Sequence, residues 1–282
     1  MDISGSRLFQ FFKYTVYVLL AFNVYVFWDE EFLAAIVQFP DGVALANMID
    51  AYAATIDTAA WVVLLLMFEL ETYVLEDHHY NPLVTRSLQT IRAICYAFIV
   101  YAFYGYIVNL GFIYEAIPLA DISDLCTLVA SDWSYTVDLD EYVQLTAANC
   151  SSFSDATTFQ RFAGIQAVVD ASGLSAILNL AWVDVINAAV WLLIVVILEV
   201  DVRLQERNRF DGKVLQVSNA FKVVLYSILL TAAIFWGFKG DFVDFWDAFL
   251  WLVAFFFIEL NVVEWRQEIK EHAAQGENGT TS

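Results

Sequence analysis

The chain alternates long apolar runs with short polar connections. Each of six runs is long enough for a helix that crosses a bilayer, which needs about 20 residues. The runs cover residues 8–28, 51–75, 91–113, 174–198, 214–238 and 243–263. No small-residue cleavage pattern follows the first run, so it is expected to remain as a helix rather than act as a signal peptide. The pattern predicts an all-α integral membrane protein with six transmembrane helices.

The polar connections differ in length and in the breaks they contain. Residues 29–50 form an acidic connection with the turn signal Pro40-Asp41-Gly42, and Pro82 marks the next break. Residues 114–172, between the third and fourth runs, form the largest and most acidic connection. Its pattern indicates no regular structure. The tail 271–282 is polar and expected to be flexible.

The second, fourth and sixth runs share one spaced set of residues. In each, an Asp or Asn stands four residues before a Trp, a Glu stands eight residues after it, and an acid or amide follows two residues later. The three sets are Asp57, Trp61, Glu69 and Glu71; Asn187, Trp191, Glu199 and Asp201; and Asp247, Trp251, Glu259 and Asn261. Such repetition indicates an internally repeated fold.

The odd-numbered runs carry a matching signal at their starts. A cation is followed four residues later by a tyrosine, in the pairs Lys13 and Tyr17, Arg92 and Tyr96, and Lys222 and Tyr226. The repeating unit is therefore predicted to be a two-helix hairpin. Hairpins cover residues 7–77, 86–207 with the insertion 114–172, and 216–270, and they are expected to pack around a pseudo-threefold axis.

Eleven uncharged residues separate the first polar residue from the Glu in each of the three sets. Eleven helical residues span roughly 16 Å, about half of a hydrocarbon core about 30 Å thick. At least one flanking polar residue must therefore lie at membrane depth. At about 100° per residue, Asp57, Trp61 and Glu71 share one stripe of the helix. The polar faces of three packed hairpins can then converge.

Composition supports the membrane class, because hydrophobic residues make up 60% of the 282 and charged residues only 16%. The net charge of −20 excludes nucleic acid as a partner. With six spans, eleven of the 13 Lys and Arg residues fall on the side that carries both termini, and 19 of the 33 acids fall on the other side. This bias predicts an inner (plasma) membrane protein with both termini in the cytoplasm.

Two functions fit these charges. The first is a cation or proton channel or transporter, since intramembrane carboxylates commonly mark ion pathways. Its candidate residues are Asp57, Glu69, Glu71, Asp184, Asn187, Glu199, Asp201, Asp247, Glu259 and Asn261. The alternative is a non-transporting scaffold or accessory subunit, with a second copy or another membrane protein as partner. There, Lys13, Arg92 and Lys222 pair with the carboxylates and each fastens its own hairpin.

The remaining candidates have simpler interpretations. Trp61, Trp191 and Trp251 are expected to pack between helices rather than to gate, and the three repeat tyrosines to be interfacial. Cys126 and Cys150 form either a disulfide or two free thiols, depending on the compartment. Neither His78-His79 nor Asp138–Glu141 has the spacing of a metal site. No nucleotide or hydrolase motif is present, so neither an enzyme nor a cofactor is expected.

Overall fold

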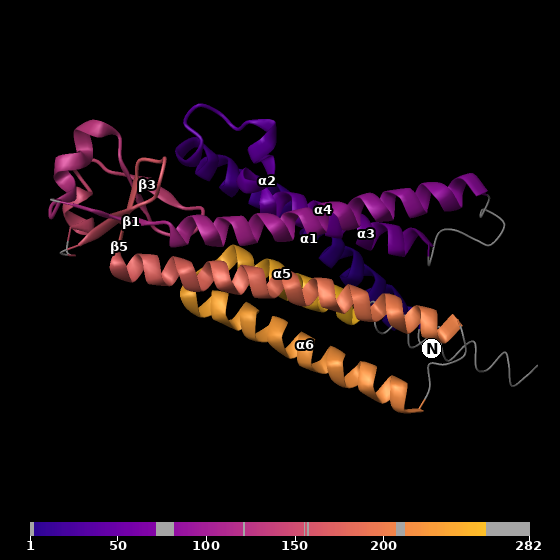
Figure 1. The fold of residues 1–282 in the computed structure, drawn as a ribbon. Helices are drawn as coiled ribbons and strands as arrows, with labels where there is room; N and C mark the ends of the chain where they lie inside the picture. The colour runs from indigo at the N-terminus through magenta and orange to yellow at the C-terminus, as the bar shows by residue number, and fades with distance from the viewer. Residues whose placement is uncertain are drawn as a thin grey trace, which may run out of the picture. The chain divides into compact units, whose positions relative to one another are not determined.

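The computed structural model describes residues 3–71, 82–120, 122–154, 156, 158–206 and 212–257, and most of them are helical. Within these residues, four helices are long and apolar enough to cross a membrane (Figure 1). They are α1 (Ile3–Gln38), α4 (Pro82–Tyr114), α5 (Ala171–Glu206) and α6 (Gly212–Lys239). By length and composition, these helices agree with the predicted membrane class.

The first helix is longer than its apolar run. It continues through Asp29, Glu30 and Glu31 to Gln38, so the prediction that residues 29–50 form a connection is wrong for the first part of that range. Glutamate is a good helix former, and nothing breaks the pattern before Pro40 and Gly42. The connection itself is therefore short.

The described part of the second apolar run forms one helix, and a sharp bend lies at its start. A short helical segment, η1 (Leu45–Asn47) with α2 (Met48–Ala51), precedes α3 (Ala53–Glu69), and the two pieces meet at 81°. Together they pass as a fifth, broken span. The break packs closely on α4, because a Cβ added to Gly105 would lie 3.1 Å from Cγ1 of Ile49. Only glycine lets α4 approach this closely.

The chain divides into two compact units, residues 23–225 and residues 1–22 with 226–282. In the first unit α3 packs against α4, and α4 packs antiparallel against α5 (Figure 1). Pro82 is the first residue of α4 rather than part of a loop, in agreement with the preference of proline for the first helical turn.

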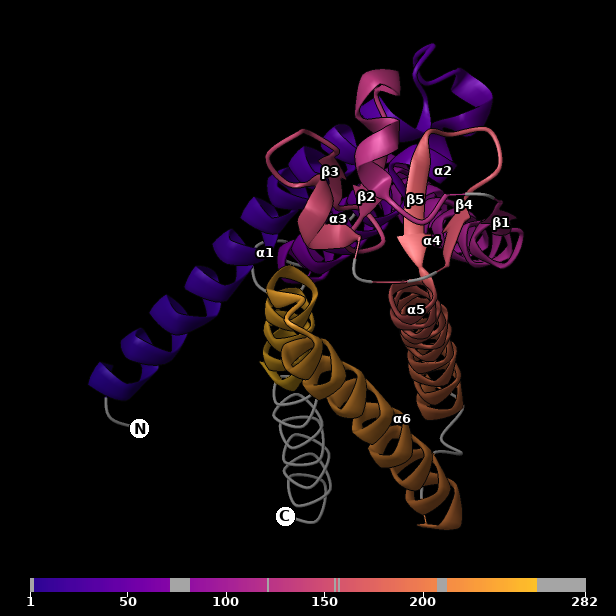
Figure 2. The same cartoon turned by 90° about the vertical axis from the view of Figure 1, so that its left-hand side faces the viewer.

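The insertion 114–172, whose structure the sequence did not predict, contains a small β sheet. Five short strands form one sheet in the order β1-β4-β5-β2-β3. They are β1 (Ile117–Leu119), β2 (Ser134–Thr136), β3 (Tyr142–Gln144), β4 (Phe159–Arg161) and β5 (Ala167–Asp170). The β2–β5 pair is parallel and the others are antiparallel. Figure 2 shows β5 running directly into α5.

Two apolar clusters hold this domain. One surrounds the disulfide between Cys126 and Cys150, which joins η4 (Leu125–Ser131) to η5 (Cys150–Phe153). The other joins the sheet to the helices, with Val169 of β5 and Phe162 packed against Leu110 of α4 and Ile177 of α5. The domain is thereby fixed to the ends of α4 and α5.

The second unit contains the start of α1, the end of α6 and a helix over residues 242–257. The rings of Phe9 and Phe12 meet Phe257 edge to face, at 5.1 and 5.6 Å between centroids. Gly237 of α6 lies close to Phe245, since an added Cβ would lie 3.3 Å from its ring. The predicted run 243–263 begins as expected, and its end lies outside the described residues.

Candidate functional site

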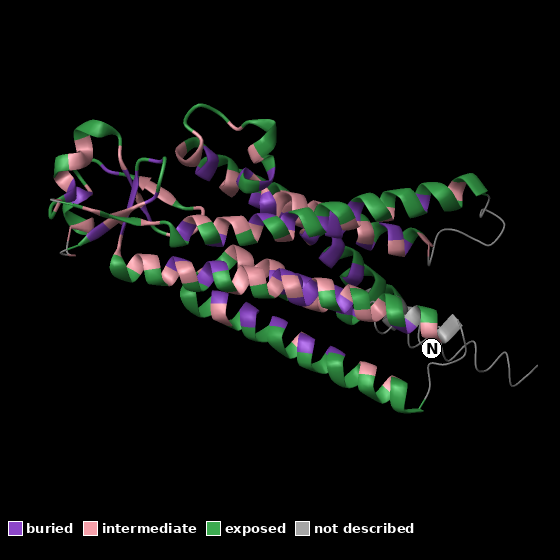
Figure 3. Ribbon diagram, viewed as in Figure 1, coloured by how far each residue is buried: buried purple, intermediate pink, exposed green. Residues whose placement is uncertain are grey.

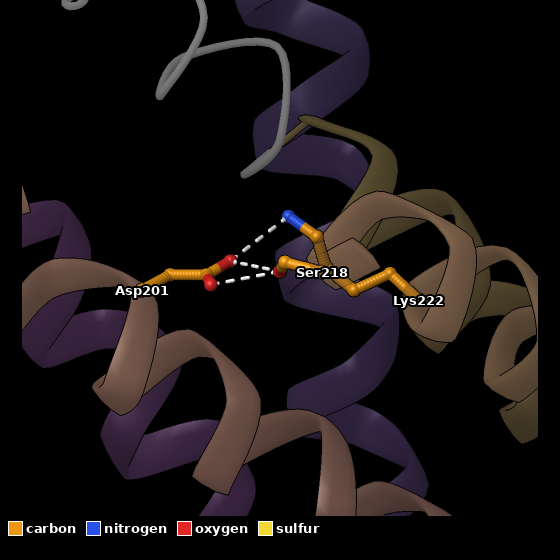
Figure 4. A network of polar contacts seen from close by, with 3 residues as sticks. All are labelled: Asp201, Ser218 and Lys222. Atoms are coloured by element: carbon orange, nitrogen blue, oxygen red, sulfur yellow. Dashed lines mark hydrogen bonds and ion pairs between the residues drawn. The ribbon is translucent and has the colours of Figure 1, made fainter. Parts of the chain in front are cut away.

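A buried charge network lies between the end of α5 and the third turn of α6 (Figure 4). The Nζ atom of Lys222 lies 3.5 Å from Oδ2 of Asp201, and the two side chains are only 7% and 5% exposed. The hydroxyl of Ser218 lies 2.7 Å from both carboxylate oxygens of Asp201. Ser218 and Lys222 are four residues apart on α6 and therefore share one face.

A second ion pair repeats this arrangement one hairpin earlier. The Nη2 atom of Arg92 lies 2.6 Å from Oε2 of Glu71, and these side chains are 39% and 24% exposed. In both pairs the cation follows the acid by 21 residues. Each pair joins the last helix of one predicted hairpin to the first helix of the next. Arg92 and Lys222 thus pair with two of the expected carboxylates, but each cation joins the preceding predicted hairpin rather than fastening its own.

The third cation occupies a comparable position in the other unit. Lys13 is 2% exposed, and its ammonium lies 5.0 Å from the ring centroid of Tyr14 and 6.0 Å from that of Tyr17. Tyr17 is buried, at 5% exposure. Tyr96 and Tyr226 are partly buried. Each of these rings is on the same helix as its cation, one turn later.

The glutamates of the repeated set have different environments. Glu69 is buried, at 7% exposure. The side chain of Glu199 is 50% exposed and binds Arg203, one turn later on α5, at 2.9 Å. Glu259 and Asn261 lie outside the described residues. Equal sequence positions therefore do not give equal burial, and Glu199 does not share the buried environment of Glu69.

The tryptophans of the first two sets meet inside the first unit. Trp61 of α3 and Trp191 of α5 are both buried, and their ring centroids are 6.0 Å apart. Trp251 is buried in the other unit beside Phe255. These contacts are those of helix packing, as expected.

Polar residues stand one helical turn before the paired tryptophans. Asp57 and Asn187 are partly buried. The Oδ1 atom of Asn187 is buried and accepts no hydrogen bond from any residue that the structure describes. Asp184 and Asp247, the other candidates on these helices, are also partly buried. A buried amide oxygen without a donor is costly, so this atom is a point at which water or an ion would be favourable.

Sequence reasoning missed the residue that holds the break between α2 and α3. Glu31 of α1 accepts hydrogen bonds from the amides of Ala54 and Thr55, at 2.7 and 3.0 Å, and from the Thr55 hydroxyl at 2.5 Å. These amides belong to the first turn of α3, where no preceding residue in the helix can satisfy them. Glu31 therefore caps α3 from another helix and complements its dipole.

The sheet domain contains its own polar anchor at the start of α5. Asp170 accepts hydrogen bonds from the Gly173 amide and the Ser172 hydroxyl, both at 2.6 Å, and from the Tyr135 hydroxyl at 3.0 Å. Burial raises the pKa of Asp170, but these three donors outweigh burial and hold the pKa below its usual range. Burial and the neighbouring Asp170 raise the pKa of Tyr135 to about 12. Asp170 is the N-terminal cap of α5.

No protein-family model, curated protein or solved structure matches the chain. The fold and its charge pairs therefore define the class by themselves. It is a mostly helical protein with apolar helices suited to a membrane, joined to a small disulfide-bonded β domain. Among the described residues, no three His, Cys, Asp or Glu side chains are grouped so that they could hold a metal ion. His78 and His79 lie outside those residues.

Proposed function

We propose that the protein is a non-transporting membrane scaffold or accessory subunit whose buried charges hold its helices together. The closed pair of Asp201 and Lys222 carries this proposal. A lone carboxylate or ammonium at membrane depth is costly. The cost is about 3 kcal/mol even on the scales that come from membrane-insertion experiments. Here each charge has its partner, and the Ser218 hydroxyl donates a hydrogen bond to the carboxylate. A closed, buried pair is suited to stabilising one arrangement of the helices rather than to moving an ion.

The proposed architecture has six spans in three hairpins, with both termini in the cytoplasm. Two ion pairs with the same 21-residue spacing support the hairpin repeat. The disulfide supports an oxidising compartment for the β domain, because such bonds persist outside the cytoplasm. The positions of the cations support the same orientation. The β domain would then be the surface that the scaffold presents outside an inner membrane.

Two measurements, each made on the wild type and on Asp201→Asn, test the scaffold proposal. The purified protein is reconstituted into liposomes, and proton and potassium flux are compared with protein-free liposomes, while thermal unfolding is followed in detergent. We expect wild-type flux at the protein-free level and a lower unfolding midpoint in Asp201→Asn. Flux that depends on wild-type protein and disappears in Asp201→Asn, with an unchanged midpoint, would contradict the scaffold.

A cation or proton pathway is the second candidate, and the Oδ1 atom of Asn187 favours it. This buried oxygen has no donor among the residues that the structure describes, and it lies one turn from the Trp61–Trp191 contact. A pathway through the even-numbered helices requires protein-dependent flux, reduced in Glu69→Gln/Glu199→Gln/Glu259→Gln. Equal flux in the wild type and the triple variant removes this candidate. Arg161→Gln, in the β domain, is the control for charge removal away from the helices.

A further inference from the structure

The first three turns of α4 carry an open hollow of about 600 Å³. It is lined by Pro82, Leu83, Arg86, Ser87, Thr90 and Ile91. Figure 3 shows that this end of α4 is mostly exposed. These residues recur at intervals of four along the chain, about one helical turn, so most of them lie along one side of the helix.

Polar groups lie at the N-terminal end of this stripe of α4, with Ser87 on the stripe and Arg86 beside it, about 100° around the helix. Arg86 makes no ion pair or hydrogen bond through its guanidinium with any residue that the structure describes, and the Ser87 side chain is also exposed. In contrast, Arg92 turns to Glu71 and is already bound. The stripe therefore presents a guanidinium group that is unpaired among the described residues, and a hydroxyl group. Both kinds of group bind phosphate oxygens.

Apolar groups continue the same stripe towards the middle of α4. Ile91, Ile94 and Phe98 are 42%, 50% and 48% exposed. From Ser87, these residues follow at intervals of four, three and four, so they remain on one face. Arg86 and Phe98 are about 18 Å apart along the helix axis, at about 1.5 Å per residue. That distance is close to the depth of one leaflet, which is half of the about 30 Å core.

We propose that this stripe, Leu83 to Phe98, binds one anionic phospholipid. The headgroup phosphate accepts hydrogen bonds from Arg86 and Ser87, and an acyl chain lies along Ile91, Ile94 and Phe98. The charge of Arg86 selects an anionic headgroup over a zwitterionic one. The change from polar to apolar groups along one face selects a lipid over a soluble phosphate. The inference needs only that α4 crosses the membrane, and it is independent of whether the protein transports ions.

The test uses the full-length protein in detergent, titrated with dioleoyl phosphatidylglycerol or dioleoyl phosphatidylcholine, with bound lipid counted by native mass spectrometry. We expect the wild type to retain one phosphatidylglycerol in preference to phosphatidylcholine. Arg86→Gln should weaken this binding about fivefold, since one basic residue near a membrane surface contributes about 1 kcal/mol. Arg86→Lys should retain part of the affinity, because the charge remains without the bidentate geometry.

Arg203→Gln is the matched control, because Arg203 is an exposed cation that already binds Glu199. It should leave phosphatidylglycerol binding unchanged. Equal losses in Arg86→Gln and Arg203→Gln would show general charge attraction and overturn the proposal. Displacement of the lipid by millimolar inorganic phosphate would assign the site to soluble phosphate and also overturn it. Helical circular dichroism of each variant separates lost binding from lost folding.

Discussion

The ammonium of Lys222 lies 3.5 Å from the carboxylate of Asp201, which stands 21 residues earlier in the chain. Arg92 and Glu71 stand in the same relation one hairpin before. Each pair therefore lies between helices of consecutive predicted hairpins rather than within one. Such pairs determine which helix lies beside which.

Removing one partner of the buried pair should be more harmful than removing both. Lys222→Met leaves the Asp201 carboxylate buried and unpaired, so we expect the free energy of unfolding to fall by about 3–5 kcal/mol. Asp201→Leu/Lys222→Met should recover most of this loss, since an apolar pair of similar volume avoids the buried charge. Urea unfolding followed by circular dichroism measures the difference. A double variant as unstable as Lys222→Met would contradict this account.

Much of the helical layout follows from the sequence, because apolar runs as long as those of α4, α5 and α6 have few alternatives. The β domain does not. Its strands contain three or four residues each, which is too short for an alternating pattern to be recognised. Its stability depends on the cluster around Leu125, Phe159 and Val168 and on the disulfide, which bring distant segments together.

The candidate site is likewise predictable from the sequence only in part. The spacing of Asp201 and Lys222 is visible in the sequence, but which helices the pair joins depends on tertiary packing. The break before α3 is still less visible. Glu31, 23 residues before Ala54, accepts a hydrogen bond from the start of α3, and Gly105 of α4 allows Ile49 to approach closely. Neither contact leaves a local sequence pattern at the break. Each of these contacts is a tertiary constraint that overrides local propensity.

The cap that Glu31 provides should govern local opening of the break. Glu31→Ala removes three hydrogen bonds, two of them from the first amides of α3. We expect a loss of about 2–4 kcal/mol, because each hydrogen bond contributes about 0.5–1.5 kcal/mol and the two amides lose their acceptor. Hydrogen exchange should accelerate at Ala54 and Thr55. Asp29→Asn, an exposed acid two residues earlier on α1, is the control, and equal acceleration in both variants would remove Glu31 as the cap.

Acid should weaken the start of α5 through Asp170. Its pKa is lower in the folded protein than the usual 3.8, so its contribution is complete above that value and is lost as pH falls through the lower folded pKa. At neutral pH, Asp170→Asn should therefore lower the unfolding midpoint of the β domain. The difference from the wild type should shrink as pH falls below about 4. Near-ultraviolet circular dichroism follows the domain through its Trp133 and Tyr135 environments. A difference that grows on acidification would contradict the sign of this pKa shift.

The disulfide should stabilise the β domain more than the helices. Cys126→Ser/Cys150→Ser opens a loop in which the two cysteines are 24 residues apart. A cross-link of that size contributes about 3 kcal/mol, chiefly by restricting the unfolded chain. We expect faster hydrogen exchange in β2, β4 and β5, with little change in α4, because the helices keep their own packing against the bilayer. Reduction of the wild type should reproduce this result, whereas Cys95→Ala, which removes the buried thiol of α4, should not. Equal exchange in the β domain with and without the bond would show that its apolar cluster alone maintains the fold.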